Sequence, residues 1–89
     1  MVSPGTQQLD LLRIIANFQK TDAVDTVEDT QLVEKTGLDL NFVRTALNEL
    51  ESIGYVHLEK IKTLSGFSYS ADLTSRGKAV VKTLSVAYP

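Results

Sequence analysis

The sequence predicts a single α+β domain in which several helices pack against a two-stranded hairpin. Apolar residues recur at helical spacing through the first half of the chain, and they alternate with polar residues between positions 55 and 73. A helical pattern returns after residue 74. A chain of 89 residues is long enough for one hydrophobic core with little left over. We therefore expect residues 1–89 to form one domain.

The first periodic segment, TQQLDLLRIIANFQK at residues 6–20, predicts a helix with a broad apolar stripe. Leu11, Ile14, Ile15 and Phe18 follow the spacing that places side chains on one helix face. We expect this face to pack inward.

A loop and a short second helix are predicted next. We expect residues 21–25 to form the loop, because they lack a clear apolar period. Thr26 followed by Asp29 fits a helix N-cap with an acidic residue at the third position. Leu32 supplies an inward contact, and Gly37 fits the C-terminal stop, where glycine adopts the left-handed conformation without steric cost.

Residues 40–53 predict a third helix, with Asp39 as its N-cap and Gly54 as its end. At roughly 100° per residue, its apolar side chains fall within an arc of about 140°. These inward residues are Phe42, Val43, Ala46, Leu47, Leu50 and Ile53. The residues outside the arc are Asn41, Arg44, Thr45, Asn48, Glu49, Glu51 and Ser52. Periodicity thus separates the buried and exposed faces of this helix.

From Tyr55 the period changes to two, which predicts a hairpin over residues 55–73. YVHLEKIKT reads as the first strand, GFSYSADL as the second, and TLSG as the turn between them. The alternation places Phe67, Tyr69, Ala71 and Leu73 on the face that we expect to cover the helices.

Thr74 is predicted to cap a last helix, SRGKAVVKTLSVAY, whose inward contacts would include Val80, Val81 and Leu84. The hairpin must lie against the helices, because an isolated hairpin is marginal in water. Two helices joined around Gly37 and Leu38 form a helix-turn-helix unit. The predicted fold is therefore a winged helix-turn-helix, with a three-helix bundle, a β-hairpin wing and a C-terminal helix.

The run QLVEKTGLDLNFVRTALNELESIGYV resembles the winged helix-turn-helix regulators of the MarR and PadR families. The matching positions are Leu32, Gly37, Leu38, Asp39, Val43, Leu47, Leu50, Glu51, Gly54 and Val56. The later run ADLTSRGKAV resembles the Leu-Thr-x-x-Gly signature that follows the wing in this superfamily, at Leu73, Thr74 and Gly77. The resemblance implies a transcriptional regulator that binds double-stranded DNA, with helix 40–53 in the major groove and wing 55–73 on the backbone.

The resemblance also implies which side chains contact DNA. The outward residues near the N-terminal end of the third helix would face base edges and phosphates: Asn41, Arg44, Thr45 and Asn48. Arginine pairs with guanine and asparagine with adenine in the major groove. In the wing, Lys60, Lys62 and Ser65 would lie beside the backbone or a minor groove, where contacts position the protein more than they read sequence.

Charge favours a dimer if the protein binds DNA. The net charge is −2, so the chain as a whole does not attract a polyanion. Residues 1–36 hold three basic and six acidic side chains, while residues 37–89 hold six and five, which fits either an ordinary mixed surface or a modest basic edge. Affinity grows with the number of neutralised phosphates, and a monomer offers few cations. We therefore expect a homodimer with doubled contacts. Its interface is expected on the first and last helices, because the apolar stripe of the first helix is broad and the last helix is apolar on more than one side, through Val80, Val81, Leu84, Val86 and Tyr88.

A second interpretation remains open: a winged helix that binds another protein and does not bind DNA. The acidic pI of about 5.2 and the single arginine on the third helix favour it, whereas the two signatures favour DNA.

The sequence does not predict an enzyme, a cofactor or a metal site. It contains no cysteine, and His57 has no second histidine, so no ligand set for a metal is apparent. No nucleophile lies beside a base, and no glycine-rich phosphate loop occurs. The N-terminal residues lack the features of a signal peptide, and the apolar stretches are too short to span a bilayer. We expect a cytoplasmic protein with no membrane partner.

Overall fold

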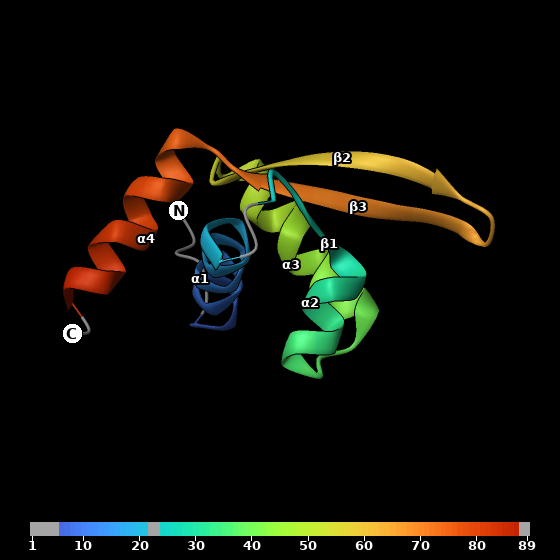
Figure 1. The fold of residues 1–89 in the computed structure, drawn as a ribbon, viewed down its shortest axis with the longest axis horizontal. Coiled ribbons are helices and arrows are strands. Elements are labelled where there is room, and N and C mark those ends of the chain that lie inside the picture. The colour runs from blue at the N-terminus through green and yellow to red at the C-terminus, as the bar shows by residue number, and fades with distance from the viewer. Residues whose placement is uncertain (1–5, 22–23, 88–89) are drawn as a thin grey trace.

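The computed structural model describes residues 6–21 and 24–87, and the side chains of residues 6, 7 and 84–87 lie outside that description (Figure 1). Within these residues the chain is α+β, with four helices and one three-stranded antiparallel sheet. The elements are α1 (Thr6–Thr21), β1 (Val27–Glu28), α2 (Asp29–Thr36), α3 (Leu40–Ser52), β2 (Val56–Thr63), β3 (Gly66–Leu73) and α4 (Ser75–Ala87). The strand order is β1-β3-β2. This arrangement is compatible with the predicted winged helix-turn-helix.

The hydrophobic core lies between α1, α2, α3 and the base of the sheet (Figure 1). Its buried apolar residues are Leu11, Leu12, Ile15, Val27, Leu32, Val43, Ala46, Leu47, Leu50, Val56, Ala71 and Leu73. Helix α4 packs against α1 through partly buried Val80 and Val81. The predicted inward contact of Leu84 concerns a side chain outside the described residues, as do the predicted roles of Val86 and Tyr88.

Strand β1 was not predicted from the sequence. Val27 is fully buried and lies opposite Ala71 of β3, so the chain is still extended where the sequence predicted the first turn of a helix. A two-residue strand has no period of its own. Its conformation depends on its partner strand, which is distant in the sequence.

The predicted N-cap of α2 at Thr26 is also wrong, because Val27 and Glu28 form β1 before the helix begins. Glu28 is the N-cap, and its backbone N–H donates a hydrogen bond of 2.9 Å to the side-chain oxygen of Gln31, within a reciprocal capping box. Asp29 is therefore the first residue of the helix, and it is fully buried.

The turn between α2 and α3 confirms the prediction. Gly37 has a φ of 72°, and its N–H donates to the carbonyl oxygen of Val33 at 2.8 Å. The carboxylate of Asp39 accepts hydrogen bonds from the N–H groups of Asn41 and Phe42, as an N-cap does. These two residues fix where α2 ends and where α3 begins.

Helix α3 buries most of its predicted apolar face, including Val43, Leu47 and Leu50. Phe42 is an exception, because 42% of it is exposed. It lies at one edge of the apolar arc and in the first turn of the helix. Its predicted burial is therefore wrong.

Hydrogen bonds join the end of α3 to the start of α4. The N–H of Thr74 donates to the Tyr55 carbonyl at 3.1 Å, and its hydroxyl donates to the Gly54 carbonyl at 2.6 Å. Gly77 donates its N–H to the Thr74 hydroxyl oxygen, which confirms the predicted cap. A Cβ atom at Gly77 would lie 2.0 Å from the Tyr55 carbonyl oxygen, so only glycine fits there. This close approach explains why residue 77 is glycine.

The hairpin of β2 and β3 extends well past the helices (Figure 1). Its register runs from Val56 opposite Leu73 at the base to Thr63 opposite Gly66 at the tip. Leu64 and Ser65 form the two-residue turn. The base of the hairpin is buried in the core, while residues 59–66 are exposed.

Candidate nucleic-acid interface

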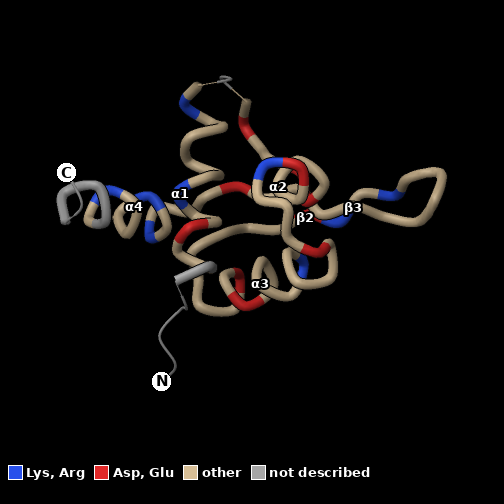
Figure 2. Tube along the Cα trace, turned by 90° about the horizontal axis from the view of Figure 1, so that it is seen from below, with Lys and Arg blue, Asp and Glu red and all other residues tan. Residues whose placement is uncertain are grey.

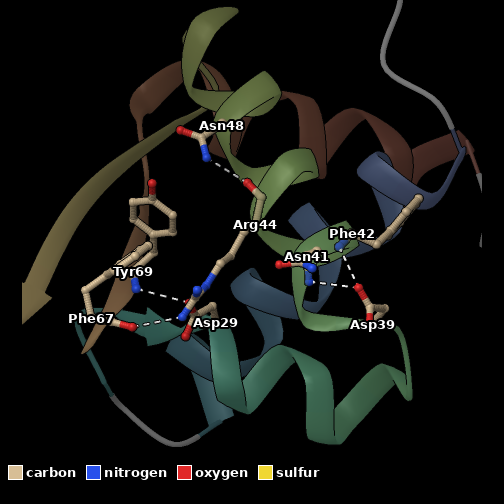
Figure 3. A network of polar contacts seen from close by, with 8 residues as sticks. All are labelled: Asp29, Asp39, Asn41, Phe42, Arg44, Asn48, Phe67 and Tyr69. Atoms are coloured by element: carbon tan, nitrogen blue, oxygen red, sulfur yellow. Dashed lines mark hydrogen bonds and ion pairs between the residues drawn. The ribbon is translucent and has the colours of Figure 1, made fainter. Parts of the chain in front are cut away.

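Three of the predicted base-facing residues, Asn41, Thr45 and Asn48, lie exposed on α3. The backbone N–H of Asn41 is held by the Asp39 carboxylate at 3.0 Å. The amide nitrogen of Asn48 donates to the Arg44 carbonyl at 2.9 Å, back onto its own helix (Figure 3). These three uncharged polar side chains of α3 are therefore exposed, as the sequence predicted.

Arg44 does not point outward as the sequence predicted. Its Nε donates to Asp29 Oδ2 at 2.7 Å, and its Nη2 donates to the Phe67 carbonyl at 2.8 Å. Only 22% of its side chain is exposed (Figure 3). The guanidinium thus joins α3 to α2 and to the hairpin. In this structure Arg44 positions other elements, and its predicted role as a reader of guanine is not supported by where it lies.

Asp29 is the residue that holds Arg44 in this position. Its side chain is fully buried, and Oδ2 also accepts the Tyr69 N–H at 3.2 Å. Within the described residues, Oδ1 has no hydrogen-bond partner. A buried carboxylate is costly unless it is paired with a cation, so the Arg44 guanidinium is needed to compensate this charge.

The Phe67 ring lies against two cations. The Arg44 Cζ atom is 4.5 Å from its centroid and the Lys60 Nζ atom is 4.2 Å away, both within the range of a cation–π interaction. Tyr69 packs against the same ring edge-to-face, with centroids 5.3 Å apart. These contacts fix the hairpin beside α3. The alternation of the second strand correctly placed both rings on the helix-facing side.

The distal part of the hairpin is basic. In the observed register Lys60 lies opposite Tyr69, and Lys62 lies opposite Phe67, so both lysines share one face of the sheet. Residues 60–71 contain these two lysines and no acidic residue. Ser65, the third predicted contact in the hairpin, is exposed in the turn.

Acidic positions lie along α3 (Figure 2), and the acidic residues Asp39, Glu49 and Glu51 are all exposed. Asp39 caps the helix, Glu49 accepts a hydrogen bond from Gln8, and Glu51 accepts the Leu58 N–H at 3.0 Å. The charge of Arg44 is balanced by buried Asp29 and does not offset these three carboxylates. The Glu51 carboxylate thus joins α3 to the edge of β2.

No protein-family model matches this sequence, and no curated protein matches it. Among residues 6–21 and 24–87, no group of three or more metal-ligating side chains is placed to hold an ion. None of the helices in these residues combines the length and apolar character needed to cross a membrane.

Proposed function

We propose that this protein is a winged helix-turn-helix transcriptional regulator of the MarR and PadR type, which binds double-stranded DNA as a homodimer. The observation that supports this proposal best is the placement of Lys60 and Lys62 on one face of the distal hairpin, although Glu59 and Asp72 make the net charge of the whole hairpin zero. Lys60 packs on the ring of Phe67, whose carbonyl accepts a hydrogen bond from Arg44 of α3, and Lys62 lies farther out on the same face of the hairpin. In the proposed complex α3 enters the major groove, and the hairpin, as the wing, contacts the backbone.

The contacts divide by chemistry. The amides of Asn41 and Asn48 and the hydroxyl of Thr45 would contact base edges, where asparagine pairs with adenine. Lys60 and Lys62 would contact phosphates and set the register of the protein on the duplex. Arg44 takes no part in reading sequence in this proposal.

The proposed dimer uses the outer surface of α1 and α4. A groove of about 650 Å³ lies beside α1, α2 and α4, and its lining combines the apolar residues Ile14, Ala16 and Val81 with five polar or charged ones, Asp10, Arg13, Asn17, Lys20 and Lys35. A second copy would cover these side chains. Dimerisation would also double the number of lysines that face the duplex, which compensates for the small number in each copy.

The test is fluorescence anisotropy with a labelled mixed-sequence duplex at low salt. We expect the wild type to bind, and we expect Lys60→Ala combined with Lys62→Ala to weaken binding at least about tenfold, because four phosphate contacts are lost per dimer. The matched control is Lys78→Ala combined with Lys82→Ala, used once light scattering shows that this variant keeps the mass of the wild type, because both lysines lie on a helix of the proposed interface. Both of these lysines are exposed on α4, at the opposite end of the molecule (Figure 1). Equal effects of the two pairs would contradict the proposed interface.

The acidic surface of α3 supports a second candidate, a protein-binding module. Asp39, Glu49 and Glu51 would attract a partner with a basic surface and repel a polyanion. Under this alternative, the wild type would bind no duplex at low salt. Glu49→Gln would then weaken capture of a protein partner, whereas the paired lysine substitutions would leave that capture unchanged.

A further inference from the structure

The tip of the β2–β3 hairpin carries a leucine that the fold does not use. Leu64 is fully exposed, at 110% of its reference area, and is the most exposed large apolar side chain of the described residues. It also lies in the two-residue hairpin turn, and the positive φ recorded at this turn belongs to Gly66, at 143°. Burial therefore does not account for leucine at position 64, and nothing in the turn calls for an apolar side chain.

The surroundings of Leu64 favour a polyanion as the partner of the tip. The segment from residue 60 to residue 71 has a charge of +2, from Lys60 and Lys62, in a chain whose net charge is −2. The turn itself is uncharged, with Thr63 before the leucine and Ser65 after it. A basic stem that ends in an apolar tip suits a surface with phosphates around an apolar interior. The faces of the base pairs form such an interior, which an apolar side chain reaches when it opens a base step.

The hairpin is held firmly enough to place this tip. Its two strands pair along their whole length, from Val56 opposite Leu73 to Thr63 opposite Gly66. Arg44 binds the Phe67 carbonyl, and its guanidinium packs on the Phe67 ring. The position of Leu64 relative to α3 is therefore set by these contacts.

We propose that Leu64 is a wedge that inserts at a base step in the minor groove, while Lys60 and Lys62 hold the flanking phosphates. Apolar side chains that enter the minor groove partly unstack a base step and kink the duplex. This inference rests on the proposed DNA binding, and it adds a deformation of the duplex to the contacts proposed above. Such a contact would favour flexible pyrimidine–purine steps such as TA.

The test uses the full chain and a mixed-sequence duplex that carries 2-aminopurine beside TA steps. Unstacking of 2-aminopurine increases its fluorescence. We expect the wild type to raise this signal. We expect Leu64→Ala to abolish the rise and to weaken binding roughly ten- to a hundredfold for each leucine lost, of which the proposed dimer has two. The salt dependence of Leu64→Ala should equal that of the wild type, because no phosphate contact is lost.

Two variants serve as controls. Thr63→Ala alters the exposed neighbour and should retain both affinity and the fluorescence rise. Leu64→Met keeps an apolar side chain of similar size and should retain most of both. Because residue 64 is exposed, its substitution should leave the fold intact. Circular dichroism of each variant checks this directly.

The outcomes separate the wedge from DNA binding itself. If the wild type binds the duplex and Leu64→Ala binds equally well with the same fluorescence, the wedge is overturned and the proposed function stands. If the wild type binds no duplex, both are overturned. Binding that depends on Leu64 but is directed to vesicles of phosphatidylserine, without binding to DNA, would overturn the wedge in favour of a membrane surface.

Discussion

Replacement of Arg44 by methionine should strongly destabilise the fold, although this residue lies on the helix proposed to contact DNA. Arg44→Met keeps much of the side-chain length and apolar contact but removes the guanidinium. Asp29 would then retain only the Tyr69 N–H as a hydrogen-bond donor among the contacts described. The carboxylate is fully buried, so water cannot replace the lost cation without local rearrangement.

The expected loss follows from the burial of the pair. Removing one partner of a buried ion pair costs about 3–5 kcal/mol, and we expect a value near 3 because 22% of the Arg44 side chain remains exposed. For a domain of this size, each kcal/mol lowers the melting temperature by about 4–8 °C. The variant should therefore melt roughly 10–25 °C below the wild type.

The assay is urea denaturation followed by circular dichroism, with Arg13→Met as the matched control. Arg13 pairs with Asp10 at 3.7 Å, but more than half of each side chain is exposed. Its loss should change the free energy of unfolding by no more than about 0.5 kcal/mol. A second variant, Asp29→Leu combined with Arg44→Met, should recover most of the stability, because it removes both buried charges.

The reasoning would be refuted if Arg44→Met lost less than about 1 kcal/mol and matched the Arg13→Met control. That result would mean that the buried charge of Asp29 does not need the Arg44 guanidinium for compensation. Contacts other than those of Arg44 would then have to hold the hairpin beside α3.

Three further predictions concern the fold and the dimer. Gly77→Ala should destabilise the protein by about 3 kcal/mol in thermal denaturation, because its Cβ would lie 2.0 Å from the Tyr55 carbonyl oxygen. A smaller loss would show that the backbone at the α3–α4 junction shifts to make room for the added methyl group. Asp39→Ala should cost about 1 kcal/mol in the same assay through loss of the α3 cap, and no loss would contradict that capping role. Asn17→Arg, at an exposed position of the proposed interface groove, should convert the dimer to a monomer in multi-angle light scattering, and an unchanged mass would place the interface elsewhere.

The sequence predicted features that depend on local spacing. The cap at Asp39, the left-handed stop at Gly37 and the buried side of α3 were each predicted correctly, because their causes lie within a few residues. The Thr74 cap was also predicted, although the reason for Gly77 became clear only with the Tyr55 carbonyl in place.

Features that depend on distant partners were not predicted. Asp29 and Arg44 are 15 residues apart on different helices, and no period or motif connects them. Helical spacing placed Arg44 outside the apolar arc, but it did not show that a buried acid lay within its reach. Strand β1 was missed for a similar reason, because Val27 is extended through its pairing with Ala71.

The salt dependence of duplex binding tests the central proposal most directly. The dissociation constant of the wild type for a mixed-sequence duplex would be measured between about 50 and 200 mM salt. Lys60 and Lys62 in two copies give about four phosphate contacts, so the logarithm of the association constant should fall against the logarithm of salt with a slope of about −3.6. Lys62→Ala should reduce the size of that slope by about 1.8. Absence of binding at the lowest salt, or a slope near zero, would contradict DNA binding through this hairpin and favour the protein-binding alternative.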